Sequence, residues 1–475
     1  MEGSFFCVFN GARLFLSLHI LMICFTHKTY PYGVEGKITS HTTSVSSLLP
    51  SPSCSPSTSK ASIRKSTLEV IHKHGPCSPL VQDPNPLNHI KVLLQDESRV
   101  KWIQSQSSNS SHGLKASAAV RLPAKSGITI GTGNYVVTIG LGTPKKDLTL
   151  IFDTGSPLTW TQCEPCIGSC YNQSEPIFNP SQSSSYSNFS CTSTSCSQLG
   201  GLRSGCSGST CQYSIGYGDQ SSSMGFFVTD KLTIAPTEVI DKFEFGCGQN
   251  NQGLFRGAAG LIGLSKDKIS IVEQTAAKYG KYFSYCLPSS PSYTGHLTFG
   301  KDGGAVSSVS FTPLSTVPRS SQFYGISILG ITVGGNRLSI PSTVFSSGGA
   351  IIDSGTVITR LPPTAYSALR TAFRNAMANY TMAPALSIFD TCYDFSKEST
   401  IKVPLITFSF AGGVDVDLDP NGIFFVAKAS QVCLAFAPNR ADSNLGIYGN
   451  TQQKTFEVVY DVAGRKLGFG SNGCS

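Results

Sequence analysis

Two short stretches of the sequence each place an aspartate between apolar residues and a tight turn. Asp153 lies in LIFDTGS and Asp353 lies in AIIDSGT. Alone, an Asp followed by Ser or Thr and Gly is an ordinary turn. A facing pair can do acid–base chemistry, because an ionised carboxylate takes a proton from water while a protonated one donates to the carbonyl under attack. The two aspartates are our candidate catalytic pair.

Two carboxylates that face each other in apolar surroundings do not both ionise easily. At about 4 Å they repel by roughly 4 kcal/mol at an effective dielectric near 20. Since about 1.4 kcal/mol corresponds to one pH unit, their ionisations separate by roughly three pH units. One carboxylate then stays ionised in mild acid while the other keeps its proton, which predicts hydrolysis at acidic pH.

Such a pair requires two similar halves that meet. YVVTIGLGT precedes the first aspartate and YGISILGITVGG precedes the second, while AAGLIGL and LGIYGN follow downstream and reach Gly263 and Gly449. Apolar runs broken by Gly and Pro predict strands and tight turns. Duplicated lobes would bring the aspartate loops together at a pseudo-twofold axis. The expected fold class is all-β and bilobal with a few short helices.

The residues after each aspartate suit a supporting role: a glycine for the sharp turn, a hydroxyl that bonds the carboxylate, and a hydroxyl that braces one loop against the other. The glycines are Gly155 and Gly355, the bonding hydroxyls are those of Ser156 and Thr356, and the bracing hydroxyls are those of Thr154 and Ser354.

Three stretches predict helices between the strands. They are HIKVLLQDESRVKWI, ISIVEQTAAKYGKYF and PPTAYSALRTAFRNAMANY. In the last, Tyr366, Leu369, Phe373 and Ala376 recur at helical spacing and are expected on one buried face.

The net charge of +8 is concentrated near the N-terminus. Residues 1–126 hold 13 Lys and Arg against 6 Asp and Glu, whereas residues 127–475 hold 23 against 22. This near balance argues against a nucleic-acid partner for the body of the protein. Seven of the eight histidines lie at or before His112, which leaves His296, in a plain strand pattern. A zinc site or a histidine-dependent nucleophile is not expected there, so hydrolysis would use carboxylates without a metal or other cofactor.

Residues 14–25 (LFLSLHILMICF) form an apolar run behind Arg13. The run is too short to span a bilayer comfortably, and it predicts a signal peptide, with a plastid transit peptide as the rival interpretation. No later apolar run is long enough for a membrane span. The predicted domains are 1–26 signal peptide, 27–124 pro-segment rich in Ser, Thr and Pro, 125–315 N-terminal catalytic lobe with a cysteine-rich insert, and 316–475 C-terminal catalytic lobe.

Cysteines in a secreted chain predict disulfides. The twelve in the body are Cys163, Cys166, Cys170, Cys191, Cys196, Cys206, Cys211, Cys247, Cys286, Cys392, Cys433 and Cys474. The spacing of the first three also permits a metal knuckle, but no histidine lies near. Sequons predict glycans on exposed loops at Asn172, Asn188 and Asn379, with a further sequon at Asn109.

DTGSPLTW, DSGTVITRL, the apolar–Gly repeats and a YGD turn together resemble the pepsin-like aspartic proteases. HKHGPCSPL, AGLIGLSKDKISIVEQTA and GNTQQKTFEVVYDVAGRKLGFG resemble the atypical plant branch that includes nepenthesins and the chloroplast-nucleoid DNA-binding protease. The resemblance implies the bilobal pepsin fold and a monomeric, secreted endopeptidase that is made as a zymogen and acts on proteins or peptides. It implies that Asp153 and Asp353 are the catalytic dyad.

The same resemblance implies roles for two aromatic residues. Tyr217, in SIGYGDQSSSMG, would be the flap tyrosine over the substrate, and Trp160 would hydrogen-bond to it. Pro157 and Gln220 depart from the pattern of the branch, where a polar residue and a glycine are common. Gln220 could alter flap mobility and specificity.

Two other functions remain open. Relatives of this fold include inhibitors, so the chain could be a silent binding protein, although both aspartates and Tyr217 are present. A plastid DNA-binding protease is disfavoured by the near-neutral body and the secretory leader. For a protease, residues 27–126 carry 12 basic and 5 acidic side chains. Such a segment would lie over a carboxylate-lined cleft at neutral pH and leave as carboxylates protonate. Apoplast is the expected location, with vacuole or chloroplast as alternatives.

Overall fold

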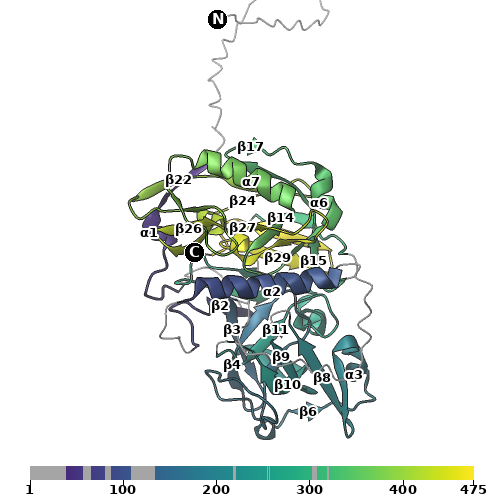
Figure 1. Cartoon of the computed structure of the whole chain (residues 1–475). Coiled ribbons are helices and arrows are strands. Elements are labelled where there is room, and N and C mark those ends of the chain that lie inside the picture. Colours follow the sequence, from purple (N-terminus) through teal and green to yellow (C-terminus); the bar gives the residue numbers. More distant parts are fainter. Residues whose placement is uncertain are drawn as a thin grey trace, which may run out of the picture. The chain divides into compact units, whose positions relative to one another are not determined.

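A computed structural model of the chain describes residues 39–56, 66–80, 87–107, 134–217, 221–253, 255, 257–301, 308–317 and 320–474. The predicted signal peptide, the Asn109 sequon and Gln220 lie outside these residues. Residues 38–475 form one compact unit, in which two groups of strands flank the long helix α2 (Figure 1). We call residues 39–56, 66–80 and 87–107 the N-terminal segment.

The first lobe consists mainly of antiparallel strand pairs, with two parallel pairs, and its buried strands carry alternating or continuous apolar residues. Its strands are β3 (Tyr135–Leu141), β4 (Lys146–Asp153), β5 (Trp160–Gln162), β6 (Ser187–Asn188), β7 (Arg203–Ser207), β8 (Thr210–Gly216), β9 (Ser222–Ala235), β10 (Glu238–Gln252) and β11 (Gly260–Gly263). Its helices are α3 (Thr194–Gln198), α4 (Ile271–Gln274) and α5 (Ala276–Tyr279).

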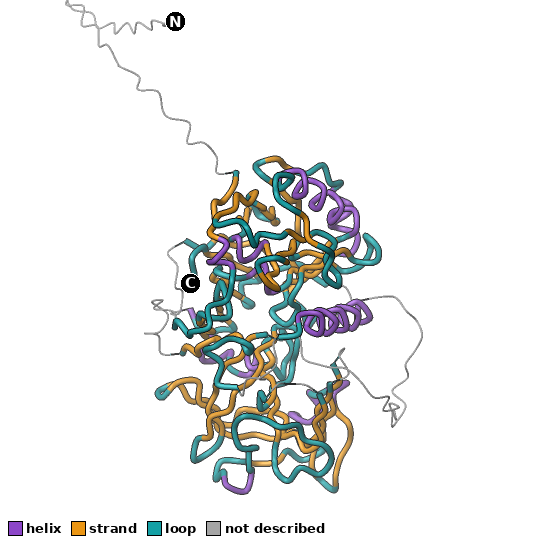
Figure 2. The backbone as a smooth tube through the Cα atoms, turned by 60° about the vertical axis from the view of Figure 1, so that its left-hand side comes forward, coloured by secondary structure: helices purple, strands orange, loops and turns teal. Residues whose placement is uncertain are grey.

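The second lobe contains three smaller sheets and the amphipathic helix α7 (Figure 2). Its strands are β15 (Tyr324–Ile326), β16 (Ile328–Val333), β17 (Asn336–Arg337), β18 (Ala350–Ile352), β19 (Thr359–Leu361), β20 (Met382–Ala383), β21 (Cys392–Tyr393), β22 (Thr400–Pro404), β23 (Ile406–Phe410), β24 (Val414–Asp417), β25 (Phe424–Lys428), β26 (Gln431–Leu434), β27 (Phe436–Pro438) and β28 (Gly446–Tyr448). Its helices are α6 (Ser342–Gly348), α7 (Pro363–Ala376) and α8 (Pro420–Ile423).

A continuous sheet links the lobes and includes a strand from the N-terminal segment. Its order is β14 (Ser310–Pro313), β30 (Lys466–Gly470), β29 (Glu457–Asp461), β12 (Tyr282–Cys286), β13 (Thr294–Phe299), β2 (Thr67–His72) and then β3. The N-terminal segment also supplies β1 (Ser40–Ser44), which pairs with β22, and the helices α1 (Val45–Leu48) and α2 (His89–Ser107). The N-terminal segment therefore pairs with strands of the body in two sheets. His296 lies buried in β13, where its Nε2 is 2.7 Å from Oε2 of Glu457.

The predicted all-β bilobal fold class is confirmed, and the helix over HIKVLLQDESRVKWI is present as α2. The prediction of one helix over ISIVEQTAAKYGKYF is wrong, because this stretch forms two single turns and a strand. Gly280 ends α5 in the left-handed conformation, with φ of 67°, and Tyr282 already begins β12. Ala376 of α7 is exposed, whereas Met377, four residues after Phe373, is buried instead.

Disulfides are present as predicted in the body, and a further bridge lies in the N-terminal segment. The pairs are Cys54–Cys77, Cys163–Cys247, Cys166–Cys170, Cys191–Cys206, Cys196–Cys211, Cys286–Cys474 and Cys392–Cys433. Cys163, Cys166 and Cys170, whose spacing also permits a metal knuckle, are all bonded in these disulfides. Within the described ranges, no cluster of His, Cys, Asp and Glu has the arrangement of a metal site. Asn172, Asn188 and Asn379 are all exposed.

None of the helices in the described part of the chain has the length and apolar character needed to cross a bilayer.

Candidate active site

Each candidate aspartate stands at the end of a buried strand that pairs in parallel with an apolar–Gly strand. β4 runs parallel to β11, and the amide of Leu264 donates to the carbonyl of Asp153 at 2.9 Å. β18 runs parallel to β28, and the amide of Asp353 donates to the carbonyl of Tyr448 at 3.1 Å. Strands covered on both faces need continuous apolar runs, which explains the residues before each aspartate. The duplicated motifs thus occupy equivalent places in the two lobes.

The two carboxylates are buried and receive matching hydroxyl donors. Asp153 is 1% exposed and Asp353 is fully buried. The Ser156 hydroxyl donates to Oδ2 of Asp153 at 2.5 Å, and the Thr356 hydroxyl donates to Oδ2 of Asp353 at 2.5 Å. These bonds fix the outer oxygen of each carboxylate and leave the inner oxygens, Oδ1, directed toward each other's loop.

Reciprocal hydrogen bonds join the two aspartate loops. The amide of Thr154 donates to the Ser354 hydroxyl at 3.1 Å, and the amide of Ser354 donates to the Thr154 hydroxyl at 2.9 Å. Both donors and both acceptors are buried, so loss of either hydroxyl would leave a backbone amide without a partner. The spacing between the aspartates is therefore set by contacts between the lobes.

Glycine is required at both turns because the opposite carboxylate comes so close. A Cβ atom at Gly155 would lie 2.8 Å from Oδ1 of Asp353, and one at Gly355 would lie 2.5 Å from Oδ1 of Asp153. The two amides also bond the neighbouring carboxylates, from Gly155 at 2.9 Å and from Gly355 at 3.3 Å. A side chain at either position would push the carboxylates apart.

The guanidinium of Arg99, on α2, lies between the two carboxylates. Its Nη2 is 2.6 Å from Oδ1 of Asp153 and 2.9 Å from Oδ1 of Asp353. Its Nη1 donates to Oδ2 of Asp153 at 3.0 Å, and its Nε donates to Oδ2 of Asp353 at 2.9 Å. A single nitrogen thus reaches both inner oxygens. The carboxylates face one another closely enough to share one small donor.

The charges of this cluster stabilise each other. Burial alone would raise the pKa of Asp353, but Arg99, together with the bonds from Thr356 and Gly355, lowers it below the ordinary value. Burial disfavours the Arg99 cation, but the two carboxylates outweigh this and raise the pKa of Arg99 above its already high value. The guanidinium therefore removes most of the repulsion that two buried carboxylates would otherwise feel.

Tyr217 and Trp160 lie beside each other in the first lobe. The indole Nε1 of Trp160 donates to the Tyr217 hydroxyl at 2.7 Å. Trp160 is fully buried, whereas Tyr217, which follows β8, is half-buried. The tip of the YGD turn is outside the described residues.

Comparisons with known proteins agree with this geometry. Residues 135–301 match the family model described as "Xylanase inhibitor N-terminal", and residues 323–471 match "Xylanase inhibitor C-terminal". An aspartyl protease family protein of Arabidopsis thaliana is 54% identical over 96% of this chain and 98% of its own length. Aspartyl protease AED1 of the same plant is 51% identical, covering 97% and 99%. Nepenthesin-2 of Nepenthes gracilis is 37% identical, covering 76% and 82%.

The chain belongs to the plant family of pepsin-like aspartic proteases. The resemblance drawn from its motifs is confirmed. Among solved structures, basic 7S globulin from soybean matches with a TM-score of 0.57 and 20% identity, covering 71% of this chain and 91% of that chain. Conglutin gamma from lupine seeds matches with a TM-score of 0.58 and 22% identity over the same shares. At these identities the matches show the fold alone.

In this aspartic protease family member, α2 runs between the two groups of strands (Figure 1), and its Arg99 contacts both carboxylates of the dyad. Its buried face carries apolar residues at helical spacing on either side of two charged ones. The apolar residues are Val92, Leu93, Val100 and Ile103, and the charged ones are Asp96 and Arg99. The Gln104 side chain adds bonds to the backbone of Leu445, at 2.6 Å and 3.0 Å. The helix is thus held on both sides of the dyad.

Asp96 binds the second lobe one helical turn before Arg99. Its carboxylate accepts hydrogen bonds from the amides of Val357 at 2.6 Å and Ile358 at 3.2 Å. Its Oδ2 also lies 3.0 Å from Nη2 of Arg360. Burial raises the pKa of Asp96 above its ordinary value, and this exceeds the opposing effect of Arg360 and the two amides.

Arg99, Asp96 and Arg360 were not among the residues predicted from the sequence for the site. A signal did exist, because two charged residues at i and i+3 interrupt the apolar face of a predicted helix. Arg360 follows Asp353 by the same seven positions that separate Trp160 from Asp153. The internal duplication could therefore have marked it as a residue that flanks the dyad.

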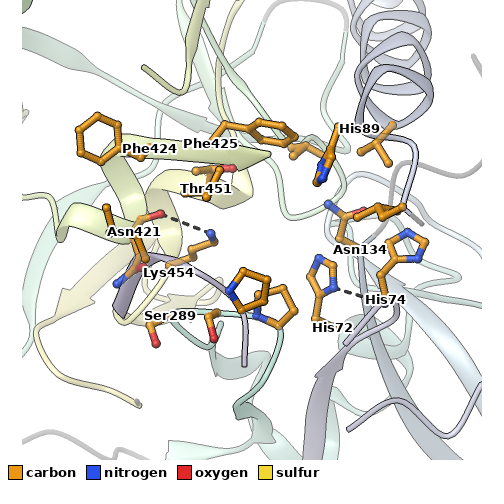
Figure 3. A pocket seen from close by; sticks show the side chains of 18 of the residues that line it. His72, His74, His89, Asn134, Ser289, Asn421, Phe424, Phe425, Thr451 and Lys454 are labelled. Carbon is orange, nitrogen blue, oxygen red and sulfur yellow. Dashed lines mark hydrogen bonds between the residues drawn. The ribbon is translucent and has the colours of Figure 1, made fainter. Parts of the chain in front are cut away.

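A cavity of about 440 Å³ lies between the N-terminal segment and the body. Figure 3 shows His72, His74 and His89 on one side and Lys454 on the other. The ring of His72 packs edge-on against Tyr135, and its Nδ1 accepts from the amide of His74 at 3.3 Å. Burial, with contributions from Lys454 and Lys73, lowers the pKa of His72 to about 3.

The pKa values of the basic side chains of His89 and Lys454 in this cavity are also lowered. Burial lowers the pKa of His89 below its ordinary value and lowers that of Lys454 to about 8. Lys454 Nζ donates to the carbonyl of Asn421 at 3.3 Å. The cavity therefore disfavours added positive charge.

We predict that Gly355→Ala destabilises the protein. The new Cβ would overlap both the Arg99 guanidinium and the Asp153 carboxylate, the latter at 2.5 Å from Oδ1. This should lower the free energy of unfolding by about 1–3 kcal/mol. Urea unfolding of the full chain with intact disulfides measures this. Gly201→Ala is the control, because a Cβ there meets nothing within 4 Å. Equal stability of the two variants would contradict the close approach of the two loops.

Proposed function

We propose that the chain is the precursor of a secreted aspartic endopeptidase that hydrolyses peptide bonds at acidic pH. The observation that carries this proposal is the position of Arg99 Nη2, within 2.9 Å of the inner oxygens of both Asp153 and Asp353. A site that lets one nitrogen bond both carboxylates also has room for one water shared between them.

In the proposed mechanism α2 leaves and a water takes the place of the guanidinium. The ionised carboxylate of the dyad accepts a proton from this water as its oxygen attacks the peptide carbonyl. The protonated carboxylate donates to the carbonyl oxygen, and the resulting gem-diol collapses as the amine leaves with a proton. Ser156 and Thr356 hold the outer oxygens, while Tyr217, steadied by Trp160, covers the substrate.

A silent binding protein is the second candidate. It is favoured by the description of the matching family model, which names an inhibitor. Against it stand the paired carboxylates, their hydroxyl donors and the Tyr217–Trp160 bond, which a binding protein would have no need to keep. A plastid DNA-binding role draws support only from the motif resemblance.

The first test is peptide hydrolysis between pH 3 and 7 by the processed protein. Asp153→Ala should reduce kcat/KM by about 100-fold or more, because it removes half of the acid–base pair. The exposed Asp415→Ala is the matched control and should retain wild-type rates. Equal activity of Asp153→Ala and wild type would reject the mechanism, and inactivity of the wild type would favour the silent binding protein.

We further propose that the N-terminal segment is an inhibitory pro-segment and that Arg99 keeps the precursor inactive. The contacts support individual ion pairs between the segment and the cleft. This arrangement is more specific than a basic segment lying over an acidic cleft. One cation of the segment pairs with the dyad, whereas two of its anions, Asp96 and Glu97, pair with Arg360. Among the described residues of the segment, charges of both signs therefore pair with the body.

Arg99→Gln should release this block. Two buried carboxylates would then face each other without a cation, a change that typically destabilises by about 3–5 kcal/mol. The uncleaved precursor should hydrolyse peptides at pH 5, with gels showing that the chain is still intact. Lys101→Gln, which removes an exposed charge from the same helix, should leave the precursor inactive. An inactive Arg99→Gln precursor that matures into an active enzyme would contradict the role of Arg99.

The titrating groups on the interface act in different directions. The pKa of His72 is lowered from 6.5 to about 3 when the segment is docked, so the released segment binds a proton more readily. The contribution of neutral His72 to docking is therefore complete above about pH 6.5 and is lost as pH falls toward 3. Asp353 also has a lowered pKa when docked, so its contribution is likewise lost as pH falls. Asp96 has a raised pKa, so its contribution is present at low pH and is lost as pH rises. Acid therefore weakens docking through His72 and Asp353, and the effect at Asp96 opposes this.

We predict that His72→Gln shifts release of the pro-segment to lower pH by about half a unit or more, because a neutral side chain gains no proton on release. Trp102 of α2, one of two tryptophans in the chain, packs edge-on against Phe323 and reports docking by its fluorescence. The titration uses Asp153→Ala chains, which should not cleave themselves. Lys101→Gln is again the control. An unshifted midpoint would show that the histidine cavity does not set the release pH.

A further inference from the structure

Arg360 is the feature of the second lobe whose partners come mainly from the pro-segment. It is 1% exposed, and its Nη2 lies 3.0 Å from Asp96 and 3.3 Å from Glu97, both on α2. Its Nη1 donates to the carbonyl of Ile358 at 3.2 Å. Once α2 leaves, this carbonyl is the one hydrogen-bond partner that remains among the contacts of the described residues. A buried guanidinium left without an anion is unfavourable.

The body supplies three donors to the single carboxylate of Asp96. They are the amides of Val357, at 2.6 Å, and Ile358, at 3.2 Å, and the guanidinium of Arg360. All three belong to the stretch that follows Asp353. Convergent amides and a guanidinium are groups that bind a carboxylate.

This anion site lies close to the dyad. Asp96 and Arg99 are three residues apart on α2, about 4.5 Å along the helix axis. An extended peptide advances about 3.3 Å per residue, so a substrate bound across the dyad could reach the site with a side chain within about three residues of the scissile bond.

The duplication of the lobes gives an independent reason to place Arg360 at the cleft. Trp160 in β5 pairs with Leu261, and Arg360 in β19 pairs with Ile447, each opposite the apolar–Gly strand of its lobe. Trp160 uses its side-chain donor to hold Tyr217. The equivalent donor in the second lobe is directed at the carboxylate carried by α2.

We propose that in the processed enzyme Val357, Ile358 and Arg360 form a subsite that selects an Asp or Glu side chain of the substrate. Asp96 occupies this subsite in the precursor as a stand-in for that side chain. The inference rests on the proposed function, because the pro-segment must leave before a substrate can bind. A Gln side chain offers no negative charge, so it would leave the guanidinium uncompensated and bind less well.

The test compares peptide pairs that differ by Glu against Gln at each of three positions on either side of a mapped cleavage site. The assay is run at pH 5, where a free Glu, with a pKa of about 4.3, is mostly ionised. At one position Glu should raise kcat/KM about ten-fold or more over Gln. The preference should fall as pH drops below about 4, when the carboxylate takes up its proton.

Variants of Arg360 test whether a preference for Glu over Gln depends on this site. The Glu-to-Gln ratio should fall toward one in Arg360→Gln and should be partly retained in Arg360→Lys, which keeps the charge but loses the planar fork. Arg337→Gln removes an exposed arginine that bonds Ser409 and the carbonyl of Leu329, and its ratio should match the wild type. Since the readout is a ratio within one enzyme, partial loss of folded protein does not affect it.

The outcomes separate this inference from the proposed function. Cleavage of all peptides with ratios near one, or a ratio that persists in Arg360→Gln, would overturn the subsite and leave the protease intact. If the processed protein cleaves no peptide, the protease proposal fails, and equilibrium binding of the same Glu and Gln pairs replaces the rates. Tighter binding of Glu that is lost in Arg360→Gln would still support the anion site, and equal binding would reject it.

Discussion

The structure depends on one electrostatic constraint: two carboxylates are buried within reach of a single donor atom. Burial and mutual repulsion both disfavour this arrangement, so every neighbouring group serves to hold it. Ser156 and Thr356 fix the outer oxygens, the turn glycines leave space for the inner ones, and Arg99 supplies the compensating cation. A protein that places two acids together in this way requires either a cation or a proton between them. The choice between the two distinguishes the precursor from the proposed enzyme.

Duplication supplies the framework, but the two lobes use it for different chemistry. The aspartate loops brace each other through identical bonds between Thr154 and Ser354. Seven residues further on, the equivalence ends, with an indole in one lobe and a guanidinium in the other. The first lobe thereby holds the hydroxyl of Tyr217, and the second holds the carboxylate of Asp96. Because the two lobes hold different groups, the two ends of the cleft differ. A peptide substrate requires such a difference, because its own two ends differ.

The sequence was most informative where a residue's role is local. The two aspartates, their hydroxyl neighbours and the strands before them could be predicted because turn chemistry and apolar runs are short-range signals. The fold class followed from their repetition. Arg99 could not be assigned, since a charged residue on a helix is usually solvated and its partners lie 54 and 254 positions away. The division of residues 269–283 into two turns and a strand was missed because pairing of Tyr282 with β29 overrides helical propensity.

The docked helix is complementary to the cleft in charge as well as in shape. It presents a cation to the two carboxylates and, one turn away, an anion to a guanidinium, so each buried charge of the cleft meets its opposite. Docking by paired charges differs from docking by a diffuse basic surface, because salt screens buried pairs weakly and only protonation or cleavage removes them. Protonation at His72 would add charge in a cavity that already contains Lys454. In the proposed precursor, protonation of His72 would therefore weaken docking of the segment without acting directly on the ion pairs at the dyad.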